Sequence, residues 1–315
     1  MTVRLAVTLG DPRGIGPEVV ARAAVRLLRE APRVSLRFLG ARPSGATDHG
    51  LPGQVETCGR FDGSPESAGA VSGAAVERAV ALAQSGEVDG VVTGPIHKPA
   101  LQAAGYTEPG HTELLQRLTG APMVGMLMAA ETTRLGGPLR VLLATTHLPL
   151  REVPDRITPG LLVDQARLLE RSLREGWAIS RPRLALCALN PHASDGGLFG
   201  DEEERIMAPA VTRLREAGVE IAGPLPADTV FSRALAGEFD AVVAPYHDVG
   251  MAAFKTVSFG AGVNVTLGLP FPRTSPDHGT AFDLAGKGVA DATSTLEALR
   301  LAARLAAGLK GPEAL

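Results

Sequence analysis

The sequence predicts an α/β protein, and three observations support this class. Short β-rich segments alternate along the chain with segments of helical period. The expected strands are almost continuously apolar, which is typical of parallel strands covered on both faces by helices. The 315 residues are enough for one large domain or for two domains with separate cores.

The expected elements follow one another with short connections. Apolar residues recur on one helical face at Val19, Val20, Ala23, Ala24 and Leu27, and the segment 161–173 sets leucines against arginine and glutamate. The segment 41–67 is rich in Gly, Pro, Ser and Asp and is predicted to be irregular or to form a sheet edge. We expect strands at residues 5–9, 36–39, 90–93, 140–145, 183–188, 241–244 and 263–267.

Composition excludes several function classes. Hydrophobic residues make up 45% and charged residues 21%, as in ordinary globular proteins, and the net charge of −3 argues against a nucleic-acid partner. The longest apolar stretch, 123–130, is too short to span a membrane, and the N-terminus shows no signal-peptide pattern. Cys58 and Cys187 are expected to be reduced thiols. These features predict a cytoplasmic protein without a membrane partner.

Three of the seven histidines, His147, His192 and His247, each follow the end of an expected strand. In open α/β sheets ligands bind beyond the carboxyl ends of the strands. Imidazoles delivered to that edge can converge on one divalent ion and leave coordination positions for a substrate. Each histidine alone is more often a surface residue, but the shared placement favours a metal site.

Other loops contain candidate binding residues, but their patterns are less specific than the placement of the three histidines. The segment 10–18 (GDPRGIGPE) is either a tight strand-to-helix turn or an anion cradle, and it is not the dinucleotide fingerprint GxGxxG. Thr112 either caps a helix or binds phosphate with His111. Lys255, Asn264 and Arg273 suit recognition of phosphate or carboxylate, or are solvated polar residues. The small-residue segment 277–288 would let a flat ligand approach the backbone.

Taken together, the motifs resemble the 4-hydroxythreonine-4-phosphate dehydrogenase family over essentially the whole chain. They are GDPRGIGPE (10–18), GHTE (110–113), ATTHLPL (144–150), NPH (190–192), GPLPADT (223–229), YHD (246–248) and RTSPDHG (273–279). The first and last are also similar to loops of the isocitrate and isopropylmalate dehydrogenases. The resemblance implies two α/β/α domains with a cleft between them, with the fold of those dehydrogenases. We expect a cofactor-associated domain at 1–127 plus 270–315 and a metal and dimerisation domain at 128–269.

The resemblance implies roles for particular residues. The divalent metal would be held by His147, His192 and His247, drawn from both subunits of a homodimer, with His247 supplied across the interface. Asp248 and Asp228 are candidates for orienting a ligand or removing a proton. The phosphorylated substrate would be held by His111, Thr112, Lys255, Asn264 and Arg273, and the cofactor would lie along Asp277, His278, Gly279, Thr280 and Asp283.

The implied reaction belongs to pyridoxal phosphate biosynthesis. It is the NAD-dependent oxidation of 4-phosphohydroxy-L-threonine to a β-keto acid, which decarboxylates to 3-amino-2-oxopropyl phosphate. NADP is the alternative acceptor. Imidazole ligands favour zinc, with cobalt or magnesium as alternatives.

Ser194 and Asp195 stand where the family has Gly and Glu, and Val249 stands where it has Gln. These departures leave the exact phosphorylated hydroxy acid open, with 4-phospho-D-threonate as the second candidate. A metal-dependent phosphatase and a non-catalytic binding protein are further alternatives. The predicted cofactor segment and the joint presence of the histidines and cations argue against them.

Overall fold

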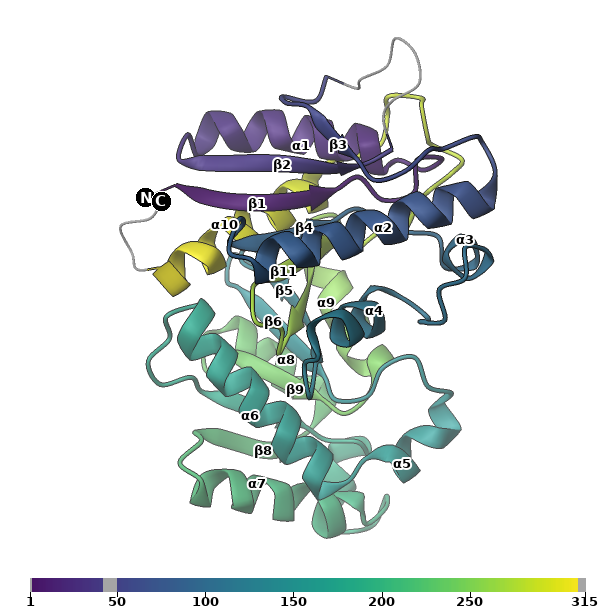
Figure 1. The fold of residues 1–315 in the computed structure, drawn as a ribbon. Coiled ribbons are helices and arrows are strands. Elements are labelled where there is room, and N and C mark those ends of the chain that lie inside the picture. Colours follow the sequence, from purple (N-terminus) through teal and green to yellow (C-terminus); the bar gives the residue numbers. More distant parts are fainter. Residues whose placement is uncertain (1, 42–49, 311–315) are drawn as a thin grey trace. The chain divides into compact units, whose positions relative to one another are not determined.

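The computed structural model describes residues 2–41 and 50–310, and the chain divides into two compact units (Figure 1). Unit 1 comprises Met1–Val124 and Val263–Leu315, and unit 2 comprises Gly125–Gly262. The chain therefore leaves unit 1, builds unit 2 without interruption and returns. The predicted domain boundaries put these crossings after residues 127 and 269.

Unit 1 is an α/β unit whose sheet has the strand order β3-β2-β1-β4-β11-β10. Helices α1 and α10 pack on each other, and α2 and α4 pack on the sheet through a separate apolar cluster that includes Ala6, Val76 and Leu115. Its elements are β1 (Val3–Thr8), α1 (Gly16–Glu30), β2 (Val34–Gly40), β3 (Val55–Thr57), α2 (Pro65–Gln84), β4 (Gly90–Thr93), α3 (Lys98–Ala103), α4 (His111–Thr119), β10 (Val263–Leu267), β11 (Arg273–Pro276) and α10 (Thr293–Lys310).

Unit 2 has the strand order β5-β6-β9-β7-β8 and is also covered by helices. Its elements are β5 (Gly125–Ala130), β6 (Leu139–Leu143), η1 (Leu150–Glu152), α5 (Val153–Arg156), α6 (Pro159–Gly176), β7 (Leu184–Cys187), η2 (Pro191–Asp195), the π-helix η3 (Glu203–Met207), α7 (Ala208–Glu216), β8 (Ile221–Leu225), α8 (Ala227–Leu235), β9 (Ala241–Ala244) and α9 (His247–Ser258).

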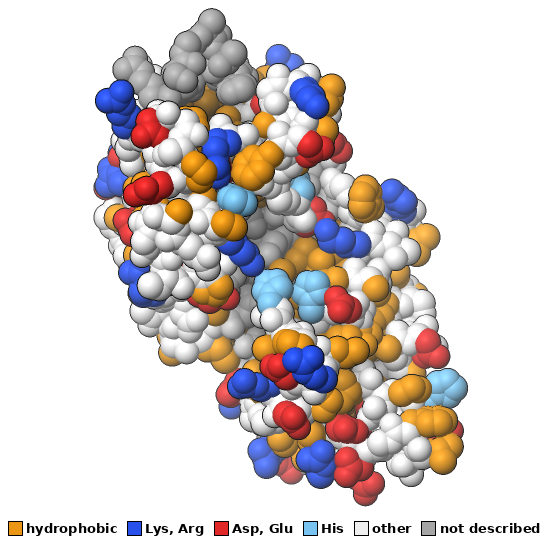
Figure 2. Space-filling model, turned by 90° about the vertical axis from the view of Figure 1, so that its right-hand side faces the viewer, with side chains coloured by type: hydrophobic (Ala, Val, Ile, Leu, Met, Phe, Trp, Pro, Cys, Tyr) orange, Lys and Arg blue, Asp and Glu red, His pale blue; other side chains and the backbone are white. Residues whose placement is uncertain are grey.

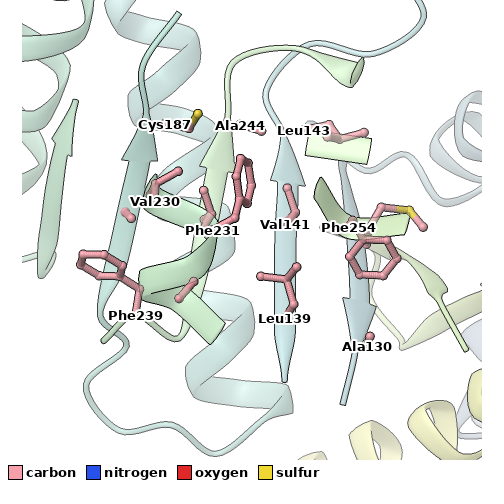
Figure 3. Packing of buried hydrophobic residues seen from close by; sticks show 14 residues of the cluster. Ala130, Leu139, Val141, Leu143, Cys187, Val230, Phe231, Phe239, Ala244 and Phe254 are labelled. Atoms are coloured by element: carbon pink, nitrogen blue, oxygen red, sulfur yellow. The ribbon is translucent and has the colours of Figure 1, made fainter. Parts of the chain in front are cut away.

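The core of unit 2 shows why its strands are apolar on both faces. Alternate residues of each strand, such as Leu139, Val141 and Leu143 of β6, enter one buried cluster with Phe231 of α8 and Phe254 of α9 (Figure 3). The intervening residues point to the opposite face because side chains alternate along a strand. Helices α6 and α7 pack on each other and contact β5 and β8, the outer strands in the order of unit 2. Burial on both faces therefore explains the continuous apolar runs.

The predicted α/β class and each predicted strand are confirmed, with small differences at the strand ends. The expectation of parallel strands is wrong for two pairs, because β5 with β6 and β10 with β11 are antiparallel. Each pair is joined by a connection without a helix, so the chain turns back beside its own strand.

The segment 41–67 contributes the edge strand β3, as expected, although residues 42–49 lie outside the described residues. Both cysteines are free, as predicted. In the described part of the chain, no helix combines the length and the apolar character that crossing a bilayer requires.

Candidate active site

His147 and His247 lie next to each other beyond two neighbouring strands of unit 2. Strands β6 and β9 pair in parallel, so their carboxyl ends lie at one edge of the sheet. A buried hydrogen bond from Thr145 Oγ1 to the carbonyl of Pro245 (2.8 Å) joins the two strand ends just before the histidines. The two imidazole rings have centroids 5.5 Å apart. Figure 2 shows adjacent histidine side chains open to solvent on one face of the molecule.

The chemistry of this pair suits a metal ion. Nδ1 of His247 lies 2.8 Å from Oδ1 of Asp248, so the carboxylate fixes the ring and leaves Nε2 available as a ligand. His147 has a positive φ of 30°, an uncommon backbone conformation for a residue with a side chain. Strained residues of this kind cluster at functional sites. Asp228 is exposed in the first turn of α8.

His192 lies on η2, just after β7, and its ring packs edge-on against Phe199 with centroids 6.4 Å apart. Strand β7 is a parallel neighbour of β9, so this histidine also follows the carboxyl end of its strand. Within residues 2–41 and 50–310, however, no three His, Cys, Asp or Glu side chains form a group that could hold a metal. One chain therefore brings together a pair of the predicted ligands and not the full set.

Arg273 is the largest fully buried side chain among the described residues, with a relative exposure of 1%. It lies on β11, where Nη1 donates to Oγ1 of Thr266 (2.9 Å) and Nη2 donates to Oγ1 of Thr93 (2.5 Å). Among the described residues its Nε has no partner and no carboxylate pairs with it. Burial without a counter-charge lowers its pKa to about 9. A buried cation in this condition is chemically suited to pair with an anion.

Two further polar groups accompany Arg273 in unit 1. The antiparallel register sets Asn264 opposite Ser275 and Thr266 opposite Arg273, so Asn264 and Arg273 share one face of the β10–β11 pair. Oδ1 of Asn264 is buried and has no partner within the described ranges. His111 begins α4, and its buried Nε2 likewise has no partner in that part of the chain.

The environment of His111 keeps its ring neutral. Burial lowers its pKa well below the ordinary value of 6.5, and the positive charges of Arg273 and Lys98 lower it further. The Lys98 side chain also passes close to the backbone of Gly110. Thr112 is not a helix cap, because the N-cap of α4 is Gly110, which makes no side-chain capping bond. The interpretation of Thr112 as a simple cap is therefore wrong.

This neutral histidine predicts a pH dependence of stability. Below about pH 6.5 the unfolded chain takes up a proton at His111 that the folded chain does not, so folding becomes less favourable as the pH falls. Replacing His111 by glutamine removes this difference. Between about pH 7.5 and about pH 5.5, urea denaturation should show the wild type losing about 1 kcal/mol more stability than His111→Gln. Equal losses in both proteins would contradict the assignment.

The predicted cofactor segment lies against the opening loop of the chain. The amide of Ile15 donates to the carbonyl of Thr280 (2.9 Å), and a side chain at Gly14 would meet that same carbonyl oxygen at 2.7 Å. The buried carboxylate of Glu18 accepts from the amides of Gly286 (3.2 Å) and Ala290 (3.3 Å). The opening loop thus positions the 277–288 segment, and Pro17 lies in the first turn of α1 as expected.

The residues of that segment differ in their surroundings. Asp277 is tied to Ser294, whose hydroxyl lies 3.2 Å from Oδ1, while Asp283 is exposed. His278 places Nδ1 3.0 Å from the carbonyl of Gly279. Lys255 belongs to unit 2, where it lies half-buried in α9.

Sequence reasoning missed a cluster on the opening loop. Arg13 forms an ion pair with Asp11 (2.7 Å), and its guanidinium lies 5.1 Å from the ring of Phe282 in the cofactor segment. His97 packs edge-on against the same ring, with centroids 5.1 Å apart. The only sequence signal was the placement of Arg13 and His97 in loops after strands, because the partner Phe282 is distant in sequence.

Residues 23–302 match the family described as "Pyridoxal phosphate biosynthetic protein PdxA". The chain belongs to the PdxA family. A 4-hydroxythreonine-4-phosphate dehydrogenase of Paracoccus denitrificans is 44% identical, over 96% of this chain and 98% of the relative. A D-threonate 4-phosphate dehydrogenase of Cupriavidus necator is 42% identical, over 96% and 97%.

Solved structures agree with this assignment. The 4-hydroxythreonine-4-phosphate dehydrogenase of Klebsiella pneumoniae superposes with a TM-score of 0.82 at 38% identity and covers 97% of this chain and 100% of that one. An isocitrate dehydrogenase of Methylococcus capsulatus, 14% identical, superposes with a TM-score of 0.54, which shows a shared fold. The resemblance to the family and to the isocitrate dehydrogenase fold is therefore confirmed, and the chain is a member of a dehydrogenase family.

Proposed function

We propose that this PdxA-family protein catalyses the NAD-dependent, metal-dependent oxidation of 4-phosphohydroxy-L-threonine in pyridoxal phosphate biosynthesis. The secondary alcohol becomes a ketone with NAD as the two-electron acceptor. The resulting β-keto acid loses carbon dioxide and leaves 3-amino-2-oxopropyl phosphate. The observation that carries the proposal is the buried Arg273, which has no counter-charge, beside His111 and Asn264. The names of the relatives support the same substrate class.

The phosphate of the substrate would occupy this cationic site. Nε of Arg273 is a buried donor without a partner, and the carboxamide of Asn264 can present its N–H groups after rotation. Neutral His111 can donate from Nε2, and a bound dianion would raise its pKa and favour the charged ring. Thr112 and Lys255 complete the proposed set. A phosphate held by fixed donors orients the reacting carbons of the substrate.

The proposed metal site uses His147, His192 and His247. Imidazole ligands favour zinc, and a bound divalent ion would acidify the substrate hydroxyl and polarise the ketone. We propose that Asp248 orients His247, since it contacts Nδ1 of that ring. Asp228 remains the other candidate base, and residues 277–283 (with Asp277, His278, Gly279, Thr280 and Asp283) remain the proposed cofactor segment.

A homodimer with a shared site is part of the proposal. Exposed apolar side chains follow two of the histidines along the chain: Leu148 (36%) and Leu150 (63%) after His147, and Leu198 (72%) and Phe199 (46%) after His192. Large exposed apolar residues beside a functional group are typical of a surface that a protein covers. A second copy of the chain that covers them would also bring further histidines to the pair.

A second substrate, 4-phospho-D-threonate, is favoured by the relative from Cupriavidus necator, which is nearly as similar as the first. The two acids share the phosphate and the secondary alcohol that is oxidised. They differ at the carbon next to the carboxylate, which carries an amino group in 4-phosphohydroxy-L-threonine and a hydroxyl in 4-phospho-D-threonate. Val249, Ser194 and Asp195 lie two or three residues after proposed ligands and are candidates for this discrimination.

The test follows NADH formation and carbon dioxide release with both acids, before and after metal removal. We expect turnover of 4-phosphohydroxy-L-threonine, its loss with a chelator and its recovery with zinc or cobalt. Turnover of 4-phospho-D-threonate alone would replace the substrate assignment and keep the reaction class. Full activity in protein shown to be free of metal would reject the metal site.

A further inference from the structure

The loop that carries His192 has an unusual backbone. His192, Ala193, Ser194 and Asp195 all have positive φ values, of 54°, 55°, 69° and 44°. Each L-residue in the left-handed region costs about 1 kcal/mol, so four in succession persist only where the surroundings hold them. The described backbone bonds within the loop, such as Ala193 N to Asn190 O (3.2 Å), are local. The restraint must therefore come from outside the loop.

That restraint is the carboxylate of Glu203. The side chain is buried, at 4% relative exposure, and no cationic side chain among the described residues pairs with it. Its Oε1 accepts from the amides of Leu189 (2.8 Å) and Asn190 (2.7 Å). Its Oε2 accepts from Nδ2 of Asn190 (2.9 Å) and from Oγ of Ser194. The carboxylate thus holds the chain on both sides of His192.

Glu203 is itself fixed to the core of unit 2. It begins the π-helix η3, whose residues Ile206 and Met207 are buried. Isolated π-turns of this kind are rare and often occur at functional sites. At Gly200 there is no room for a side chain, since a Cβ would lie 2.6 Å from Nδ2 of Asn190. Burial alone would raise the pKa of Glu203, but hydrogen bonds from Asn190 and Ser194 outweigh it, so the pKa is lowered and the group stays charged.

We infer that Glu203 is a positioning residue for His192: its buried carboxylate holds the left-handed loop that presents the imidazole as a metal ligand. The inference rests on the proposed function for the metal role of His192. The hydrogen-bonded contact between Glu203 and the loop is independent of that role. None of the family motifs includes Glu203, and its position in the run of four acidic residues 201–204 gave no sequence signal that sets it apart.

The test compares Glu203→Gln with Glu204→Gln, an adjacent exposed glutamate that serves as the matched control. In Glu203→Gln one oxygen can still accept from the two backbone amides. The new amide nitrogen, however, faces Nδ2 of Asn190 and cannot accept its hydrogen bond. In metal-free protein we expect faster hydrogen exchange of residues 190–197 in Glu203→Gln only, with core amides unchanged. Zinc affinity should fall about 10- to 100-fold, as for other partners of metal ligands, and kcat should fall with little change in KM.

A second variant covers the case in which Glu203→Gln does not fold. Ser194→Ala removes one donor to the carboxylate and should change loop exchange and zinc affinity in the same direction by a smaller factor. Wild-type exchange and zinc affinity in both variants would overturn the inference. A different outcome is faster exchange in Glu203→Gln together with undiminished zinc binding by His192→Ala. It would reject the metal role of His192, and with it that part of the proposed function.

Discussion

Replacing Arg273 by methionine is expected to lower kcat/KM for the phosphorylated substrate by about 100-fold or more while leaving the fold intact. Removing one partner of a buried, hydrogen-bonded charge pair typically costs about 2–5 kcal/mol. Each factor of ten in rate corresponds to about 1.4 kcal/mol. Because Arg273 is buried without a counter-charge in the free protein, its removal should be neutral or stabilising for folding. Activity should therefore fall while stability stays the same or rises.

The measurements are steady-state kinetics and thermal unfolding with and without inorganic phosphate. Phosphate should raise the Tm of the wild type and have little effect on Arg273→Met, since a ligand stabilises only a protein that binds it. Arg273→Lys is the matched control, because it keeps the charge but loses the planar fork that reaches Thr266 and Thr93. Near-normal kcat/KM in Arg273→Met would place the phosphate elsewhere.

Replacing His247 by alanine is expected to abolish bound metal and turnover together. The ring of His247 lies beside that of His147, and its Nδ1 contacts the carboxylate of Asp248. Loss of one of three proposed ligands removes much of the binding energy, whereas Asp248→Asn should keep the ligand and weaken metal affinity only about 10- to 100-fold. Metal content and zinc titration of the two variants measure the difference. A His247→Ala protein that retains metal and activity would contradict the assignment.

Mixed dimers can show how the ligands are divided between subunits. His192→Ala mixed with the double variant His147→Ala/His247→Ala regains activity if His192 of one subunit completes the pair of the other. A mixture of His147→Ala with His247→Ala regains activity if those two ligands come from different subunits, as the resemblance implied. Their proximity within one chain favours the first mixture. Activity in neither mixture, with each variant shown to be dimeric, would argue for a site within one subunit.

Much of the fold was predictable because it depends on local patterns. Continuous apolar runs predicted β1, β2, β4, β6, β7, β9 and β10, and their alternation with helical segments predicted the α/β class. Strands β5 and β8 were not predicted. The placement of histidines after strands predicted that His147 and His247 would lie at one sheet edge, which the parallel pairing of β6 and β9 explains. Strand β11 escaped prediction because its sequence RTSP contains an arginine and a proline and has no apolar run.

The sequence alone established the family, the fold class and the chemical character of the candidate residues, since motifs and apolar periodicity are encoded along the chain. Three features depended on contacts between distant segments. Arg273 is buried without a carboxylate because β11 lies between β4 and β10. The opening loop is a support for residues 277–288 because Ile15 and Glu18 bind its backbone. The His192 loop is held by Glu203 because a π-turn returns that carboxylate to the end of β7. Burial and hydrogen-bond partners are properties of the packed chain, and sequence spacing does not specify them.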